Sequence, residues 1–230
     1  MSGPGAPDVV VIGAGVMGAS VAWHLVGLGA KVTVLEREDE TGRGSTGRAT
    51  GGFRAQYATE INVALSLLAR EKLLRFQDEL SVDPGYRPAG YLWLARTEAQ
   101  LSLLRAGQRV QHAVGLESSR MLSTREIGEV NPFVRTAGIA GAAYCPADGF
   151  IRPLEILRGY LQGAQRLGAR LLTSTRPLAF EKDSAGRIVG VQTAAGTLAT
   201  GAVVNAAGPW AAQVARLAGL AIPVAPLRRQ

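Results

Sequence analysis

The order of apolar and polar positions near the N-terminus predicts a strand, a helix and a second strand. The runs "DVVVI" at residues 8–12 and "KVTVLE" at residues 31–36 are typical of strands buried on both faces. Between them, "MGASVAWHLVGL" at residues 17–28 is typical of a helix, with Gly29 as its end signal. This order of elements predicts a βαβ unit with parallel strands.

Farther along the chain, helical and strand patterns alternate. Residues 59–80 predict an amphipathic helix that begins after Thr59 and turns an apolar face to a core, made of Ile61, Leu65, Leu68, Leu73, Phe76 and Leu80. Other helices are expected at residues 98–115, 123–132, 153–168 and at the end of 202–220. Strands are expected within residues 85–97, after Gly168, as a three-stranded antiparallel meander over 175–201, and from residue 202.

The turn after the first strand carries the spacing G-x-G-x-x-G at Gly13, Gly15 and Gly18. The first glycine permits a tight turn, the second lets the backbone approach a pyrophosphate, and the third allows close helix packing. Glu36 ends the second strand, where an acid can accept from an adenosine ribose. Because an acid there disfavours a 2′-phosphate, the pattern favours NAD or FAD over NADP.

The loop "GSTGRATGGFR" at residues 44–54 follows shortly after Glu36. Its glycines allow a close approach to a ligand, and Ser45 and Thr46 can donate to phosphate oxygens. A long polar loop beside the nucleotide suits FAD better than NAD. The alternative is an exposed linker without a ligand.

Composition narrows the class of protein. The chain of 230 residues is 47% hydrophobic, which is enough for one large domain or two small ones. Its charge of +7 comes from scattered arginines without a dense basic run, which disfavours nucleic acid and fits a phosphate or carboxylate ligand or a solvated surface. The glycine-broken N-terminal run has no basic segment before it, so no membrane span is expected.

The cysteine and histidine content argues against disulfides and metal. Cys145 is the only cysteine, so it has no partner for an internal disulfide and is expected to be a buried, inert thiol in a reducing compartment, taken as the cytoplasm. His24 and His112 are the only histidines and lie far apart in the sequence. A conventional metal cluster is therefore not expected.

Several motifs together resemble one known family. The segments "VVVIGAGVMGASVAWHL", "GSTGRATGGFRAQY", "DGFIRP", "VVNAAGPWAAQVA" and "IPVAPLRRQ" occur in the order and spacing of the D-amino-acid oxidase and sarcosine oxidase (DAO) family of FAD-dependent oxidoreductases. The chain looks nearest to the sarcosine and dimethylglycine oxidase or dehydrogenase branch. The likeness covers essentially the whole chain.

The resemblance implies a set of cofactor residues. The FAD pyrophosphate would be held by Gly13, Gly15, Val16, Met17 and Gly18, and the adenosine end by Glu36 and Arg37. The ribityl chain and isoalloxazine ring would lie beside Gly44, Ser45, Thr46, Thr50, Gly51 and Gly52. Adenine would be touched by Arg176 and Pro177, and the phosphates covered by Ala207, Gly208 and Trp210. Arg54 falls where a family arginine pairs with the substrate carboxylate.

The fold expected from these patterns and the resemblance is α/β, with a Rossmann-like FAD-binding domain and an inserted α+β substrate lobe. FAD-binding parts are placed at residues 1–85 and 150–218, the inserted lobe at 86–149, and the start of a substrate-domain sheet at 219–230. A strand begun at "IPVAPLRRQ" would lack its neighbour and leave apolar surface around Ile222 and Val224. The chain is therefore expected to be incomplete at its C-terminus and unable to turn over substrate alone.

The function implied by the resemblance is oxidation of the C–N bond of an N-methyl or secondary amino acid by hydride transfer to flavin. The substrate would be a small amino acid or amine, and partner subunits are possible. One alternative is a flavin-binding or electron-transfer subunit without catalysis of its own. Another is an ordinary NAD-dependent Rossmann dehydrogenase.

Overall fold

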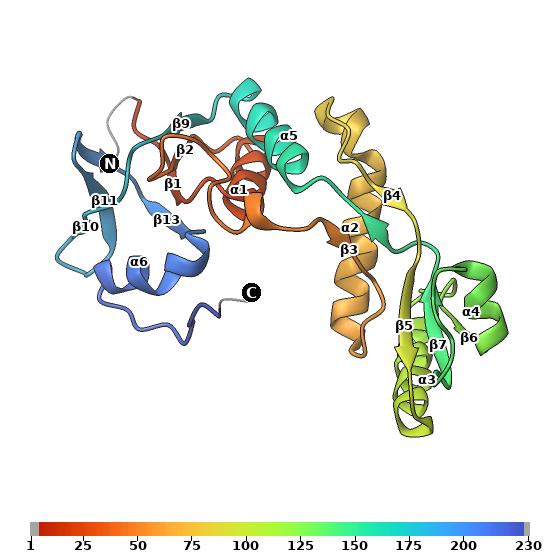
Figure 1. Cartoon of the computed structure of the whole chain (residues 1–230). Coiled ribbons are helices and arrows are strands. Elements are labelled where there is room, and N and C mark those ends of the chain that lie inside the picture. Colours follow the sequence, from red (N-terminus) through yellow and green to blue (C-terminus); the bar gives the residue numbers. More distant parts are fainter. Residues whose placement is uncertain (1–4, 228–230) are drawn as a thin grey trace. The chain divides into compact units, whose positions relative to one another are not determined.

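In the computed structural model, which describes residues 5–227, the N-terminal βαβ unit forms the centre of a parallel sheet (Figure 1). Neighbouring strands are parallel throughout, in the order β13-β1-β2-β9. The predicted strand–helix–strand order is confirmed. The elements are β1 (Val9–Ile12), α1 (Val16–Gly27), β2 (Val32–Leu35), β9 (Arg170–Leu172) and β13 (Ala202–Asn205).

Both faces of this sheet are covered, which explains why its strands are continuously apolar. On one face, Val11 and Val34 belong to a core cluster with Ala22 of α1 and Ala164 of α5 (Pro153–Arg166). On the other face, alternate residues of the same strands pack against the meander and the last helix. That second cluster contains Val10, Ile12, Leu35, Val191 and Val214.

The meander expected at residues 175–201 is confirmed as an antiparallel sheet in the order β10-β11-β12. A tight turn links β10 to β11, where Asp183 accepts from the backbone N–H groups of Ala185 and Arg187. These bonds and the Arg187 side chain lower the pKa of the Asp183 carboxyl. The bounds are β10 (Ala179–Lys182), β11 (Ile188–Thr193), β12 (Gly196–Ala199) and α6 (Ala211–Leu217).

Contacts divide the chain into two units. Unit 1 takes in the described residues of Met1–Thr50, Leu80–Val82 and Pro153–Gln230, and unit 2 comprises Gly51–Glu79 and Asp83–Arg152. The division falls at Thr50 and Arg152, whereas the sequence placed the inserted lobe at residues 86–149. Unit 2 therefore takes in the strand that leads to Arg54 and nearly all of the long helix that follows.

Unit 2 contains two small antiparallel sheets and three helices. The sheet orders are β3-β8-β4 and β5-β7-β6, so the two strands within residues 85–97 belong to different sheets and do not form a hairpin. Strand β5 lies at an edge of its sheet. The elements are β3 (Gly52–Phe53), α2 (Glu60–Leu80), β4 (Arg87–Pro88), β5 (Tyr91–Ala95), α3 (Glu98–Ala113), β6 (Arg120–Leu122), α4 (Thr124–Val130), β7 (Gly141–Cys145) and β8 (Gly149–Phe150).

Helix α2 begins and ends close to its expected bounds, but the face assigned to the core is partly wrong. Ile61, Leu65 and Leu68 are 65%, 55% and 53% exposed. The buried position in this half of the helix is Val63, which packs with Ala55, Leu116 and Cys145. At about 100° per residue, the three exposed positions point away from Val63. Phe76 and Leu80 are buried as expected.

The strand expected at residues 222–230 is not observed. Residues 220–227 belong to no strand or helix, and residues 228–230 lie outside the described residues. A strand needs a neighbour to satisfy its N–H and C=O groups, and this segment pairs with no strand among the described residues. Val224 is 47% exposed, in line with the expected apolar surface. No helix within residues 5–227 has both the length and the apolar content needed to cross a membrane.

Candidate functional site

The glycine turn between β1 and α1 needs glycine at its first and third positions for steric reasons. Gly13 has φ of +103°, where side chains are disfavoured, and an added Cβ would lie 2.5 Å from the carbonyl oxygen of Ala206. A Cβ on Gly18 would lie 1.9 Å from the carbonyl oxygen of Gly13. Helix α1 therefore approaches the turn as closely as the sequence motif predicts.

The second glycine of the motif, Gly15, has an ordinary backbone conformation and lines the cavity described below. The nearest atom to an added Cβ is the Thr46 hydroxyl oxygen, at 3.3 Å. That oxygen accepts a hydrogen bond of 3.1 Å from the backbone N–H of Val16, in the first turn of α1. The polar loop after Glu36 thus reaches back to the N-terminus of α1, where unpaired N–H groups favour anions.

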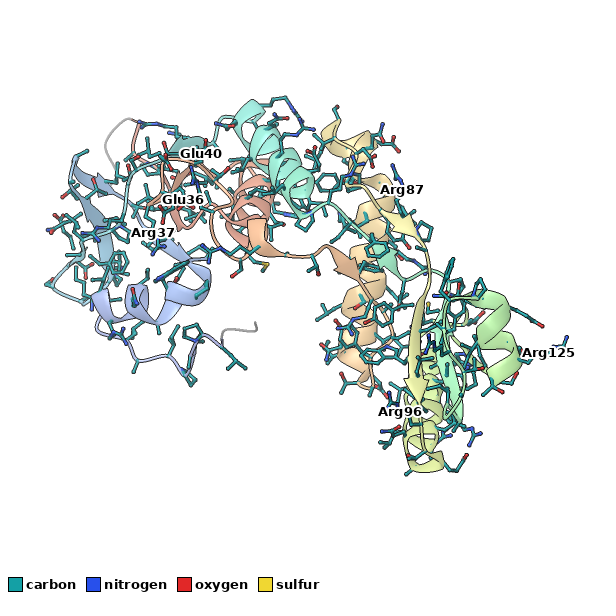
Figure 2. The ribbon with its side chains drawn as sticks, viewed as in Figure 1. Glu36, Arg37, Glu40, Arg87, Arg96 and Arg125 are labelled. Carbon is teal, nitrogen blue, oxygen red and sulfur yellow. The ribbon has the colours of Figure 1, made fainter. Side chains whose placement is uncertain are left out.

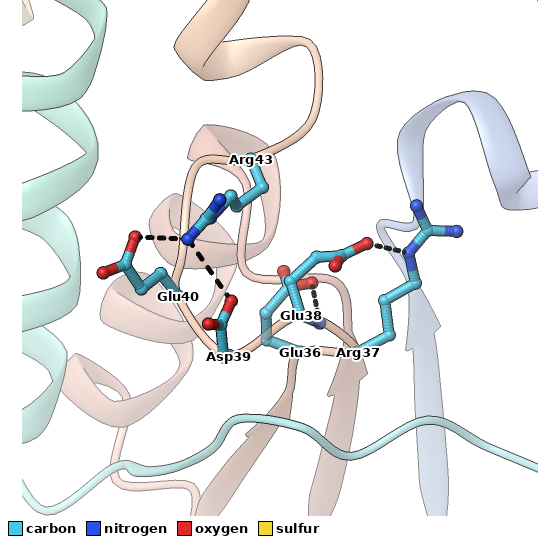
Figure 3. A network of polar contacts seen from close by, with 6 residues as sticks. All are labelled: Glu36, Arg37, Glu38, Asp39, Glu40 and Arg43. Atoms are coloured by element: carbon cyan, nitrogen blue, oxygen red, sulfur yellow. Dashed lines mark hydrogen bonds and ion pairs between the residues drawn. The ribbon is translucent and has the colours of Figure 1, made fainter.

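Glu36 is held in place by the main chain on both of its carboxylate oxygens. One oxygen accepts from the N–H of Ala14 at 3.0 Å, and the other accepts from the N–H of Glu38 at 3.1 Å. Figure 3 shows this carboxylate beside the acidic and basic side chains that follow it. Because a carboxylate has about four acceptor positions, Glu36 can still accept from two hydroxyl groups of a ligand.

Arg37 directly follows Glu36 in the chain, and its guanidinium stacks on an aromatic ring. Its guanidinium carbon lies 3.6 Å from the ring centroid of Trp210, and its Nε donates to Glu38 at 2.8 Å. Figure 2 shows the side chains of Glu36 and Arg37 in unit 1, and Figure 3 shows the ion pair with Glu38. Trp210 comes from residues 208–210, far along the chain, so the stack joins two segments that the sequence had linked only through a family resemblance.

These groups surround a cavity of about 410 Å³ within unit 1. The expected cofactor residues that line it are Gly13, Gly15, Glu36, Arg37, Gly44, Ser45, Arg176, Pro177, Ala207, Gly208 and Trp210. Of the others, Val16, Met17, Gly18, Thr46 and Thr50 belong to unit 1 without lining the cavity, and Gly51 and Gly52 belong to unit 2. The size suits a small-molecule or cofactor site.

The cavity has the groups that a dinucleotide requires. A glycine turn and a helix N-terminus can take phosphates, and a fixed carboxylate can accept from ribose hydroxyls. The Cβ positions of Gly13 and Gly18 are filled by backbone, while that of Gly15 is limited only by a hydroxyl. The described residues contain no cluster of three or more His, Cys, Asp or Glu side chains that could hold a metal ion.

Arg54 belongs to unit 2, where three aromatic rings surround it. Its guanidinium carbon lies 5.9 Å from the ring centroid of Tyr57, 5.4 Å from that of Tyr91 and 5.1 Å from that of Trp93. These distances are within the range of cation–π attraction. The resemblance indicated Arg54 but not the rings, and Tyr91 and Trp93 come from β5, about forty residues later in the chain, so no local pattern links them to Arg54.

Asp148 is a further residue of this region that the sequence patterns did not indicate. Its carboxylate is fully buried; one oxygen accepts from the N–H of Ala55 at 2.8 Å and the other from the Gln56 side-chain amide at 3.1 Å. The sequence feature that could have indicated Asp148 is an acidic residue directly before a glycine in "DGFIRP". A buried carboxylate is costly unless hydrogen-bonded, so Asp148 fixes the segment after Arg54.

Burial raises the pKa of two other side chains near this segment. Burial raises the pKa of the Tyr86 phenol, whose hydroxyl donates to the carbonyl of Ala147 at 2.5 Å and whose ring packs on Phe53. Burial likewise raises the pKa of the Cys145 thiol. Cys145 is buried, as expected, and its protonated form is a poor nucleophile.

Comparison with known proteins gives a consistent result. The family model described as "FAD dependent oxidoreductase" (DAO) matches residues 8–230. Mouse mitochondrial sarcosine dehydrogenase is 28% identical over 226 residues, which are 96% of this chain and 24% of that protein. Glycine oxidase from Geobacillus kaustophilus is 29% identical over 228 residues, which are 96% of this chain and 59% of that protein.

Among solved structures, L-proline dehydrogenase from P. horikoshii superposes with a TM-score of 0.88 at 29% identity, over 94% of this chain and 57% of that one. The α/β fold class predicted from the sequence is thereby confirmed. The chain spans between about a quarter and three fifths of the length of these relatives. Since the family model matches nearly all of the sequence, the chain belongs to the DAO family of FAD-dependent oxidoreductases.

Proposed function

We propose that the chain binds FAD in the cavity of unit 1 and serves the oxidation of an amino acid at its C–N bond. The observation that carries the FAD assignment is the cavity itself, since it brings together the glycine turn, Glu36 and the Arg37–Trp210 stack. FAD is the cofactor that gives the family its description. The names of the relatives, sarcosine dehydrogenase and glycine oxidase, support an amino-acid substrate.

Five of the cavity residues have a proposed role toward the cofactor. The turn at Gly13 and Gly15, with the first turn of α1, takes the pyrophosphate, and Glu36 accepts from the adenosine ribose. Arg37, held over Trp210, closes one wall of the cavity. When bound, FAD supplies the acceptor for the hydride that leaves the substrate carbon.

The finer proposal concerns the substrate. We propose an N-methyl or secondary amino acid whose carboxylate binds Arg54, because a guanidinium offers two parallel donors to a carboxylate. The half-buried position of Arg54 among aromatic rings supports this role, since a partly desolvated cation attracts an anion more strongly than one in open water.

The FAD assignment predicts the outcome of replacing Gly15 by valine. The branched side chain would meet the Thr46 hydroxyl and enter the cavity, so flavin binding should fall by about a hundredfold or more, roughly 2.7 kcal/mol. Because Gly15 has a negative φ, the fold should persist. The measurement is the visible absorbance of the purified chain after incubation with FAD. Unchanged stoichiometric flavin in Gly15→Val, or a wild-type chain that never takes up FAD, would contradict the assignment.

The substrate assignment predicts a different result for Arg54. In the active enzyme, Arg54→Ala should leave the flavin bound but raise KM for N-methylglycine about tenfold or more, with Arg54→Lys recovering only part of the loss because the two-pronged donor is gone. The check is steady-state kinetics with N-methylglycine at fixed ionic strength. If Arg54→Ala has the wild-type KM, Arg54 is a surface residue without a substrate role.

The two alternative functions, an NAD-dependent dehydrogenase and a flavin-binding or electron-transfer subunit, are not equally supported. Membership of an FAD-dependent family favours FAD over the nicotinamide cofactor of the Rossmann dehydrogenase alternative. A flavin-binding or electron-transfer subunit that depends on partner chains stays open, and co-purification of further chains with the flavin would favour it. The roles of the segments 1–85, 86–149, 150–218 and 219–230, and a cytoplasmic location, also stay proposals.

A further inference from the structure

The three aromatic rings around Arg54 present their faces to its guanidinium and keep part of their own surface open. Tyr57, Tyr91 and Trp93 are 37%, 37% and 38% exposed. Tyr91 and Trp93 also contact each other, with ring centroids 5.4 Å apart and planes tilted by 47°. The four side chains form what we term the Arg54 cluster, made of Arg54, Tyr57, Tyr91 and Trp93.

The backbone beneath the Arg54 cluster is fixed by buried polar side chains. Asp148 accepts from the N–H of Ala55, and the Gln56 amide donates both to Asp148 and, at 3.0 Å, to the carbonyl of Tyr91. The Gln111 amide donates to the carbonyl of Tyr57 at 3.1 Å. The backbone carbonyl groups of Tyr57 and Tyr91 therefore each accept a hydrogen bond from a buried side-chain amide. Trp93 lies two residues after Tyr91 on the same strand, so its backbone is held by the same contact. A preorganised cluster loses little conformational freedom when it binds a ligand.

The charge of Arg54 has no acidic partner of its own. Within residues 5–227, no carboxylate lies within 4.0 Å of its guanidinium, and that group makes no hydrogen bond. Four arginines of unit 2 form ion pairs, for example Arg87 with Asp83 at 2.9 Å and Arg125 with Glu129 at 3.0 Å, whereas others, such as Arg96 and Arg109, form none among the described residues. Both Asp148 oxygens are already bonded to the segment after Arg54.

We propose that Tyr91, Trp93 and Tyr57 are positioning residues, which hold the guanidinium of Arg54 by ring faces in place of a carboxylate. A protein carboxylate would occupy the N–H edge of the guanidinium, whereas an aromatic face attracts the cation without accepting from that edge. The cluster is therefore built to keep the donors of Arg54 free for the carboxylate of a small ligand. This inference rests on the proposed role of Arg54 and adds the residues that make that role specific.

The test is carboxylate binding by the whole 230-residue chain in the absence of FAD. Trp93 is one of three tryptophans, and it lies in the cluster, so its fluorescence should report the ligand. N-methylglycine and acetate should change the emission saturably, and N-methylglycinamide, which lacks the carboxylate, should not. Trp93→Phe should remove the change in emission, which would show that the change comes from Trp93 and not from Trp23 or Trp210.

Matched variants separate the contribution of the rings to carboxylate binding from the contribution of Arg54. Arg54→Ala should weaken N-methylglycine binding about tenfold or more, Tyr91→Leu should weaken it about threefold to tenfold, and Tyr91→Phe, which keeps the ring face, should stay within about twofold of wild type. Circular dichroism checks that each variant is folded. For any variant with altered fluorescence, saturation-transfer NMR of the methyl signal of N-methylglycine gives the same comparison without relying on tryptophan.

The outcomes separate this inference from the proposed function. If Arg54→Ala weakens binding but Tyr91→Leu does not, the rings have no positioning role and the inference is overturned, while the role of Arg54 stands. If N-methylglycinamide binds as well as N-methylglycine, or if neither Arg54→Ala nor Tyr91→Leu matters, both the inference and the substrate role of Arg54 fail. Because FAD is absent, failure of the FAD assignment leaves the titration unaffected.

Discussion

Replacing Gly18 by alanine should destabilise unit 1 by about 3 kcal/mol and abolish FAD binding, although it adds a single methyl group. The new Cβ would lie 1.9 Å from the carbonyl oxygen of Gly13 and 3.3 Å from the Cβ of Ala206. The closest of these atoms is backbone in a tight turn, so no rotamer change relieves the contact. Helix α1 would have to move away from the turn that forms the phosphate site.

A matched control lies in the same helix. Gly27→Ala places the same methyl group where no atom lies within 4 Å, and it should be neutral or stabilise α1 by roughly 0.5 kcal/mol through helix propensity. Thermal unfolding and FAD titration measure both variants. A loss of about 3 kcal/mol corresponds to roughly 6–12 °C in Tm for a chain of this size. Equal Tm values for Gly18→Ala and wild type would show that the turn relaxes more easily than its geometry indicates.

Replacing Asp148 by alanine should destabilise unit 2 by about 3 kcal/mol. It removes the acceptor for the N–H of Ala55 and for one contact of the Gln56 amide, in a place that water does not reach. The segment that carries Arg54 would lose its main anchor. We therefore also expect weaker carboxylate binding by the Arg54 cluster.

Asparagine at the same position is the control for shape and charge. Asp148→Asn keeps one carbonyl oxygen for the N–H of Ala55 but turns an amide toward the Gln56 amide, so it should cost about 1 kcal/mol. Urea unfolding followed by tryptophan fluorescence gives both values. A loss in Asp148→Ala no larger than that in Asp148→Asn would mean that the buried N–H of Ala55 finds another acceptor.

The N-terminal βαβ unit was determined by the sequence because its signals are local. An apolar strand, three glycines at fixed spacing, a helix and Glu36 all lie within about thirty residues. The same holds for the meander, whose strands alternate in polarity and are joined by short turns, and for the capping box of Ser123 and Glu126 at the start of α4. In each case neighbouring residues supply both the pattern and the partner.

Tertiary structure alone decided which distant segments meet. The exposure of Ile61 and Leu65 on α2 depended on which side of the helix packs against Ala55 and Leu116, and periodicity cannot specify that choice when both sides carry apolar residues. The Arg37–Trp210 stack joins residues more than 150 positions apart, and the Asp148 bond to Ala55 has a separation of 93. Such contacts are set by the packing of whole elements, so no local pattern records them.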